Sequence, residues 1–351
     1  MRRFLCAVSA AVCTALLVQA CATTGAKTTD ATASVEACFA ATERREGDKA
    51  IALCDSALAT PGLSADLQAK ALAARGASYN DKKAYARGVA DFNQALVLKP
   101  DDLFALSNRG WAYNQMADFD RAVADFDRVI SLRPSEIAYA NRSYAYALKG
   151  DFTASIRDLD RAIQLKPDGA ELYSNRGWAH MMLGEMVPAL TDLSRAVELN
   201  PKLARTYENR STLYFIQGDY GLAAADIERA IEISPDNPFG YIWLYIATRR
   251  DHRDASAVLQ KAAKANADWP AVILRFIQGK ATELNVHEEV RSEPYGAISK
   301  VRDCHTQLIL GELALLDQWT ETAASHFRYA SSACPLAQTE RVVAEAELKR
   351  L

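Results

Sequence analysis

The sequence predicts an all-α fold, a right-handed solenoid of stacked helical hairpins, because two features recur together along it. Proline returns at steps of 33 or 34 residues, at Pro100, Pro134, Pro167, Pro201 and Pro235. Arginine keeps the same spacing, at Arg75, Arg109, Arg142, Arg176 and Arg210. A repeat of this length holds one pair of antiparallel helices, and such pairs bury their apolar faces by stacking on one another.

The unit that begins at Leu103 shows which side chains build the hairpin. Its bulky, small, aromatic, small, bulky and proline positions are held by Leu106, Gly110, Tyr113, Ala122, Phe126 and Pro134. Small residues let two helices approach closely, larger ones fill the space between them, and proline ends the second helix. The pattern resembles the tetratricopeptide repeat, and five units that carry it span residues 69–237.

Weaker units flank these five. Residues 34–68 are expected to form a degenerate capping repeat, and residues 238–299 a degenerate hairpin followed by an irregular helical insert. The spacing of small and bulky positions returns in a last repeat at residues 300–335. Residues 336–351 are predicted to form a capping helix, since the terminal units of a solenoid must present a polar outer face.

The N-terminus has the pattern of a secretory signal peptide. Arg2 and Arg3 precede an uncharged, almost continuously apolar run that ends at Val18, which predicts a cleaved segment over residues 1–20. Residues 21–33 are small and polar, as in a flexible tether.

Cys21 stands where the signals of bacterial lipoproteins carry their lipid-bearing cysteine, so it is the predicted site of lipid attachment. The expected location is the periplasm, at the outer membrane if Cys21 is lipidated. Secretion as a soluble periplasmic protein, cleaved after Ala20, is the alternative.

Four cysteines follow Cys21, namely Cys38, Cys54, Cys304 and Cys334. An even number of cysteines in an exported protein favours disulfides, and four cysteines allow three pairings. The hairpin register favours 38–54 and 304–334, because antiparallel helices bring these positions to the same level. Unpaired buried thiols are the alternative.

Each repeated arginine is followed sixteen residues later by an aspartate, at Asp91, Asp125, Asp158, Asp192 and Asp226. Both positions are expected near the interface between helices, where a charge needs a partner. We therefore predict structural Arg–Asp ion pairs along the solenoid. A clamp for a charged ligand is the alternative, which the repetition in five units disfavours.

The first helix of each hairpin lines the concave face of such a solenoid, where partners usually bind. The residues predicted to face this groove are Phe104, Trp111, Tyr144, Trp178, Met181 and Phe215. Aromatic side chains on a rigid surface give a large contact area at low entropic cost. Packing under neighbouring helices, or under the C-terminal segment of the chain, is the alternative.

The composition argues against other functions. The formal net charge is −3, whereas proteins that bind nucleic acids are usually strongly basic. The five histidines share no metal-ligand spacing, and they are His180, His252, His287, His305 and His326. No catalytic motif was recognised, so we expect no enzyme, no cofactor and no metal.

Short motifs in the second half extend the resemblance. They are NPF at 237–239, WLY at 243–245, WP at 269–270 and FIQGK at 276–280. With the N-terminal signal, they resemble the NlpI-like bacterial lipoproteins. This resemblance implies a dimeric, lipid-anchored scaffold of the cell envelope that brings cell-wall hydrolases to a protease or to each other. The alternative is a lipoprotein that helps to assemble a secretin, a pilus or a polysaccharide-export system.

Overall fold

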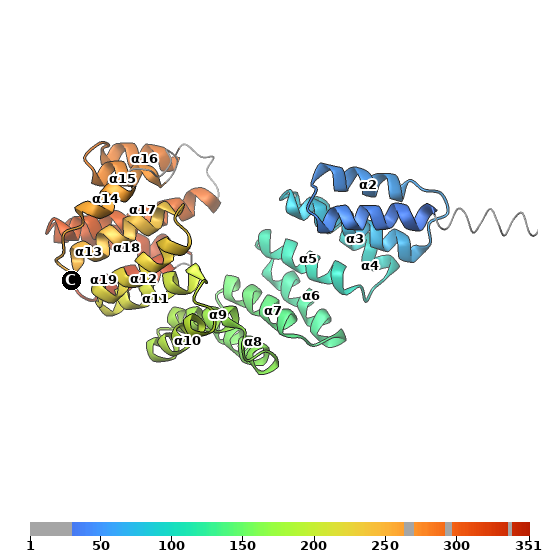
Figure 1. Cartoon of the computed structure of the whole chain (residues 1–351), viewed down its shortest axis with the longest axis horizontal. Coiled ribbons are helices and arrows are strands. Elements are labelled where there is room, and N and C mark those ends of the chain that lie inside the picture. The colour runs from blue at the N-terminus through green and yellow to red at the C-terminus, as the bar shows by residue number, and fades with distance from the viewer. Residues whose placement is uncertain (1–29, 263–269, 292–296, 336–338) are drawn as a thin grey trace, which may run out of the picture. The chain divides into compact units, whose positions relative to one another are not determined.

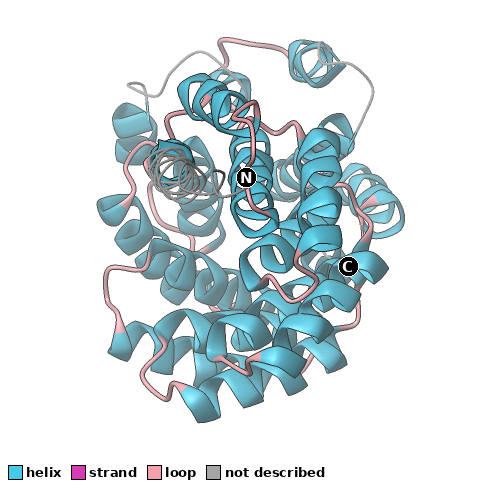
Figure 2. Cartoon of the chain, turned by 90° about the vertical axis from the view of Figure 1, so that its right-hand side faces the viewer, coloured by secondary structure: helices cyan, strands magenta, loops and turns pink. Residues whose placement is uncertain are grey.

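Helical hairpins make up the regular structure of this chain. The computed structural model describes residues 30–262, 270–291, 297–335 and 339–351, and within these ranges the elements are helices joined by loops, with no strand (Figure 2). The predicted all-helical hairpin architecture is thereby confirmed. The expected signal peptide, Cys21 and most of the expected tether lie outside the described residues.

The chain divides into two compact units, and the boundary between them in the sequence falls within helix α7 (Glu136–Lys149). The first unit extends to Ala145 and the second runs from Tyr146 to Leu351. The first contains a helix at residues 30–43, then α2 (Asp48–Leu58), α3 (Ala65–Asp81), α4 (Tyr85–Leu98), α5 (Leu103–Gln115) and α6 (Phe119–Leu132) (Figure 1).

The start of the first unit differs from the expected tether. Residues 30–33 already belong to a helix, and Ala31 is buried. The reason is the apolar pattern of Ala31, Val35 and Cys38, which places the three side chains on one face of that helix, and all three are buried.

The second unit continues the hairpins and then becomes irregular. Its regular helices are α8 (Phe152–Leu165), α9 (Ala170–Met182), α10 (Met186–Leu199), α11 (Ala204–Gln217), α12 (Tyr220–Ile233) and α13 (Pro238–Arg250). Short helices follow, namely α14 (Ser256–Ala262), α15 (Ala271–Ile277) and α16 (Glu283–Arg291). The chain ends with α17 (Ala297–Leu316), α18 (Thr320–Ala333) and α19 (Thr339–Leu348).

Local sequence explains where the hairpins turn. Gly150 and Gly218 have φ values of 85° and 88°, the left-handed conformation that ends a helix and favours glycine. Asp151 directly follows Gly150 and caps the next helix, since its carboxylate accepts a hydrogen bond from the backbone N–H of Ala154. Asp118, which follows Ala117, caps α6 in the same way through the backbone N–H of Arg121.

Close packing explains the small residues of the repeat. A β-carbon on Gly110 would lie 2.9 Å from the ring of Phe126, and one on Gly311 would lie 2.5 Å from the ring of Phe327. Both rings are buried between the two helices of their hairpins. The small position is therefore set by the bulky position of the same repeat.

Helix α19 packs back onto α11 and α18, as well as on α17. The guanidinium of Arg350 donates a hydrogen bond to the carbonyl oxygen of Phe215, at 3.4 Å. The C-terminal helix therefore covers part of a repeat that lies far from it in the sequence. In the described part of the chain, no helix is both long and apolar enough to cross a membrane.

Candidate functional site

The arginine and aspartate positions meet inside four hairpins. Arg75, Arg109, Arg176 and Arg210 each donate two parallel hydrogen bonds of 2.6–2.9 Å to the aspartate sixteen residues later. The four aspartates are buried, and this bidentate geometry gives a buried carboxylate its best partner. Arg142 and Asp158 belong to different units, so their pairing stays a prediction.

Each of these arginines also has a partner on the preceding second helix. The Nη1 group of Arg109 donates to Asn93 at 2.7 Å, and that of Arg176 donates to Asp160 at the same distance. Arg142 lies 2.5 Å from Asp127. These partners follow the paired aspartate of the previous hairpin by two residues. The arginine thus holds three helices together, which favours a structural role over a ligand clamp.

Hydrogen bonds to the paired aspartates raise the pKa of four of these arginines further. The bonds to Asp91 and Asp192 raise the pKa of Arg75 and Arg176 well above the usual range, although partial burial opposes the rise. The pKa of Arg109 and Arg210 is raised for the same reason. Each Arg–Asp pair carries no net charge, and both oxygens of its carboxylate already accept hydrogen bonds. The pair is therefore a poor binding site for a further charged ligand.

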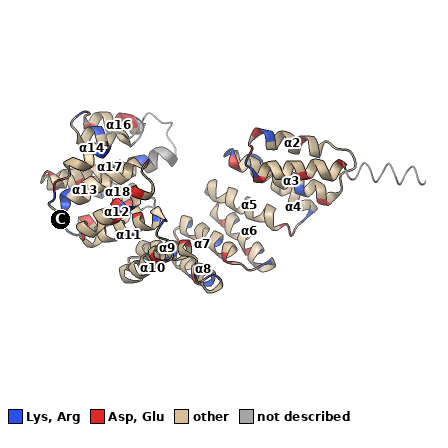
Figure 3. Ribbon diagram, viewed as in Figure 1, with Lys and Arg blue, Asp and Glu red and all other residues tan. Residues whose placement is uncertain are grey.

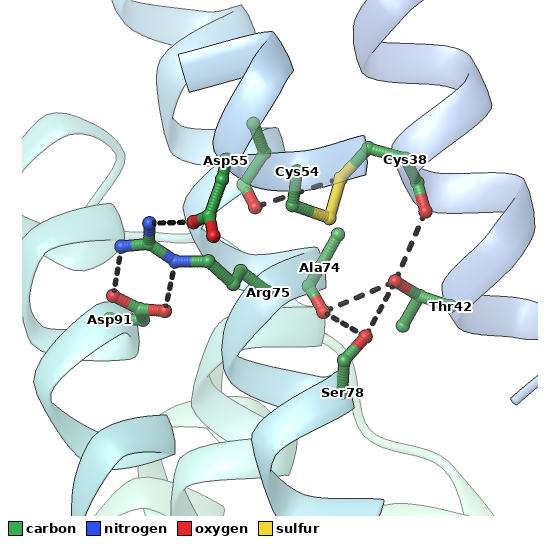
Figure 4. The surroundings of a disulfide bond; sticks show 9 residues. Cys38, Thr42, Cys54, Asp55, Ala74, Arg75, Ser78 and Asp91 are labelled. Atoms are coloured by element: carbon green, nitrogen blue, oxygen red, sulfur yellow. Dashed lines mark hydrogen bonds and ion pairs between the residues drawn. A yellow bond between two sulfur atoms is a disulfide. The ribbon is translucent and has the colours of Figure 1, made fainter. Parts of the chain in front are cut away.

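The cysteines stand together in two pairs. Cys38 and Cys54 form a disulfide with a Cα–Cα distance of 4.7 Å, and Cys304 and Cys334 form one at 5.5 Å. The first pair is fully buried beside a polar contact, in which the hydroxyls of Thr42 and Ser78 lie 2.9 Å apart (Figure 4). The first disulfide joins the helix at residues 30–43 to α2, in the first described hairpin. The second joins α17 to the C-terminal end of α18, in the last hairpin.

Three residues of the predicted groove are exposed in the first unit. Trp111 on α5 is 40% exposed and Tyr144 on α7 is 44% exposed, at equivalent positions of two successive hairpins. The ring of Trp111 rests edge-on against Tyr85, with centroids 5.5 Å apart. Phe104, also exposed, packs on Phe39 at 5.4 Å. These contacts hold the rings in place while leaving much of their area open.

The groove assignment of Met181 and Phe215 is wrong, because both side chains are buried. They occupy the same repeat position as the buried Asn114, three residues after the position of Trp111. On a helix three residues make about 300°, so this position turns toward the neighbouring helices. Phe215 packs edge-on against Trp243 at 5.3 Å.

Trp178, which lies in the second unit, is neither as exposed as Trp111 nor as buried as Met181. It is partly buried, and its ring packs edge-on against Phe152 at 5.6 Å. This contact is of the same kind as the one between Trp111 and Tyr85 in the first unit. Trp178 belongs to the second unit, so of the three aromatic residues at this repeat position only Trp111 and Tyr144 lie in the first unit.

Family models match three stretches of the sequence. The model described as "TPR repeat" matches residues 143–184, and the one described as "Tetratricopeptide repeat" matches residues 105–136 and 204–237. The chain contains tetratricopeptide repeats. No curated protein matches the sequence as a whole or in part.

Solved structures of tetratricopeptide repeat proteins are similar to this chain, and the first of those that follow shares its fold. A tetratricopeptide repeat protein from Parabacteroides merdae ATCC 43184 is 17% identical with a TM-score of 0.52, over 80% of this chain and 98% of that one. TTC0263 from Thermus thermophilus is 21% identical with a TM-score of 0.44, over 51% and 98%. YrrB, described as a TPR protein with an unusual peptide-binding site, is 19% identical with a TM-score of 0.41, over 54% and 97%.

Acidic and basic residues are interspersed along the helices of each unit (Figure 3). Among the described residues, no three His, Cys, Asp or Glu side chains come together as a metal site would need. Of the exposed aromatic side chains that the groove prediction named in the first unit, Trp111 and Tyr144 share one repeat position, and these two form the candidate site.

Proposed function

We propose that this chain is a non-catalytic scaffold that binds other proteins through the exposed aromatic surface of its first unit. The observation that carries the proposal is the exposure of Trp111 and Tyr144 at one repeat position of two successive tetratricopeptide hairpins. Large aromatic side chains held on a rigid surface bury much area when a partner docks, and they lose little conformational freedom.

The expected test is a loss of partner binding in the double variant Trp111→Ala, Tyr144→Ala. Each truncation removes a central aromatic contact, so we expect the Kd of a captured partner to rise at least about tenfold. Binding is measured by interferometry with a partner recovered from envelope extracts on the purified protein.

Trp319→Ala is the matched control, because Trp319 is 62% exposed but lies on the second unit. It should leave the Kd unchanged, and urea unfolding should show all variants folded. An unaltered Kd in the double variant would show that the partner does not bind at Trp111 and Tyr144. Hydrolytic activity of the purified chain would contradict the non-catalytic role.

The finer proposal is that the scaffold works in the bacterial cell envelope and recruits cell-wall hydrolases or a protease. Support comes from the signal-like N-terminus and from two disulfides, which persist in oxidising compartments. Recovery of hydrolases or a protease from envelope extracts is the expected outcome. Recovery of a secretin, pilus or export component would instead favour the assembly role.

Lipid attachment at Cys21 has its own test. Cells given a labelled fatty acid should incorporate the label into the wild-type protein and not into Cys21→Ser. Cys38→Ser is the control, because it also removes one cysteine but leaves Cys21 in place, and it should keep the label. A protein without label, released from the cell envelope in soluble form, would show that Cys21 is no anchor.

A further inference from the structure

The C-terminal helix α19 lies against a repeat surface of the second unit. It contacts α11, the first helix of its hairpin, as well as α17 and α18 (Figure 1). Thr212 on α11 holds the repeat position of Trp111 and Tyr144, and it lines a cavity together with Val343 of α19. The same repeat position therefore lies beside a helix of the chain itself in the second unit and carries exposed aromatic side chains in the first.

Two of the four buried residues of α19 are glutamates. The four are Glu340, Val343, Ala344 and Glu347. The glutamates are seven residues apart, which is about two turns, so they lie on one face of the helix with the two small apolar side chains between them. Leu348 adds a partly buried apolar contact. The attachment of α19 therefore depends as much on what its glutamates contact as on apolar packing.

Each glutamate meets a cation from another helix. The Oε1 atom of Glu340 lies 2.6 Å from Nε2 of His305 on α17. The Nδ1 atom of His305 lies 2.9 Å from the carbonyl oxygen of Val301, which can only accept, so both ring nitrogens donate and the ring is charged. Glu347 accepts a hydrogen bond of 3.1 Å from Arg250 on α13. The surface beneath α19 therefore matches a helix with two acidic residues at this spacing.

The rest of the second unit can keep its charges paired when α19 leaves. Arg250 also donates a hydrogen bond of 2.7 Å to Glu312 on α17, which is buried. This pair stays in place, while Glu340 and Glu347 pass into water with α19. His305 loses its carboxylate, but it can release its proton and become neutral. Release of the helix therefore leaves no buried carboxylate without its cation, which would oppose it strongly.

The packing of α19 leaves a cavity of about 260 Å³. Phe215, Trp243 and Leu308 line it, and so does Val343 of α19. A larger apolar side chain at the position of Val343 would extend into this space and gain contacts that valine does not make. A helix with leucine or phenylalanine at that position would therefore fit the surface better than α19 itself does.

We propose that α19 occupies a binding site for an amphipathic helix of a partner protein, and that the partner helix displaces it. The partner helix carries two acidic residues seven positions apart, which pair with His305 and Arg250. A leucine or phenylalanine three residues after the first acid enters the cavity. Helix α19 then acts as a competitor within the chain, and it keeps the site closed until such a partner is present.

The inference rests on the proposed function only in taking the helix to come from a protein. Its test uses a fluorescein-labelled peptide of residues 339–351 that carries Val343→Leu, titrated with the full chain and followed by polarisation. In the chain variant Val343→Asp a buried charge loosens α19, so we expect a Kd on the order of 100 μM. The wild-type chain should bind at least about tenfold more weakly, because its own α19 competes. Failure of the aromatic surface in the first unit would not affect this titration.

Changes in the peptide test the chemistry without altering the fold of the chain. Glu340→Gln, Glu347→Gln in the peptide should raise the Kd at least about tenfold, because both ion pairs are lost. Glu345→Gln is the matched control, since Glu345 pairs with Arg341 of the same helix at 3.0 Å, and it should leave the Kd unchanged. The peptide with the natural valine should bind about fourfold more weakly than the leucine peptide, as suits the loss of one buried methylene group.

A second chain variant keeps the test decisive if Val343→Asp fails to fold. Glu347→Gln in the chain removes one charge of α19 and keeps its shape, so its Kd for the leucine peptide should lie below that of the wild type.

Several outcomes would overturn the proposal. The same Kd for the wild type and both chain variants would show that the peptide binds elsewhere. No binding to either variant up to about 1 mM peptide would show that α19 does not vacate a helix-binding site. An unchanged Kd for the peptide without its two glutamates would reject the acidic pattern. A dimer in sedimentation equilibrium that Val343→Asp abolishes would assign the site to α19 of a second copy of the chain.

Discussion

Replacing Arg250 by methionine is expected to lower the free energy of unfolding of the second unit by about 3–5 kcal/mol at pH 8. The guanidinium of Arg250 donates to Glu312 at 2.7 Å and to Glu347 at 3.1 Å, and both carboxylates are buried. Methionine keeps the length of the side chain but removes the cation that both acids share, and leaves only Arg350, which pairs with Glu347. Removing one partner of a buried ion pair costs far more than removing an exposed one.

The effect should be concentrated where the cluster joins α13, α17 and α19. Urea unfolding gives its size, and hydrogen exchange of the α19 amides gives its place. Arg249→Met is the control, since Arg249 is exposed and its described bond is to the hydroxyl of Tyr245 at 2.9 Å. Equal losses in the two variants would show that the buried cluster contributes nothing specific.

The pH dependence of the same cluster has a defined sign. Burial raises the pKa of Glu312 to about 8 from its ordinary 4.5, with a further rise from Glu347 and an opposing effect of Arg250. Between these values the folded chain holds a proton that the unfolded chain has released, so stability falls as the pH rises from about 4.5 to 8. The loss in Arg250→Met should accordingly be smaller at pH 5 than at pH 8.

Glu312→Gln isolates this group. The variant keeps the shape of the side chain but cannot ionise, so its urea midpoint should change less between pH 5 and pH 8 than that of the wild type. Parallel curves for the two proteins would show that Glu312 does not take up the proton.

The second large effect is expected from the disulfide of the first unit. Cys38→Ala, Cys54→Ala should destabilise the first hairpin by about 3 kcal/mol, because closing a loop with a sequence separation of 16 removes about that much chain entropy from the unfolded state. Alanine is chosen since both sulfurs are fully buried and a hydroxyl would add a desolvation penalty.

Hydrogen exchange locates this effect as well. The amides of α2 and of the helix at residues 30–43 should exchange faster in the double variant. Cys304→Ala, Cys334→Ala is the matched control, because it removes the disulfide of the second unit and should leave these amides unchanged. Faster exchange throughout the chain in both variants would contradict a local role for each disulfide.

The sequence was sufficient for features that repeat. Arg109 and Asp125 recur at fixed positions, so the hairpin geometry alone brings them together. The third partner was missed because its identity varies, from Asn93 to Asp160 to Ser194, while only its position is constant. A search for polar residues two places after each paired aspartate would have found it.

Features that depend on non-repeating contacts could not be predicted in this way. The cluster around Arg250 and the cavity beside Glu340 both need α19 to pack back on α11. No spacing in the sequence reports that contact. Phe215 was misplaced for a related reason, since the side of a helix that a neighbour covers depends on which neighbour is present.

The arginine contacts have a consequence for how such a chain can change its length. Each paired aspartate is buried within the hairpin that supplies its arginine, while the additional carboxylates on the preceding helix are about half exposed, at 54% for Asp55 and 45% for Asp160. Water can therefore replace the additional contact at little cost. A gene duplication or deletion in steps of one whole hairpin leaves no buried charge unpaired, so these ion pairs do not restrict the number of hairpins in the array.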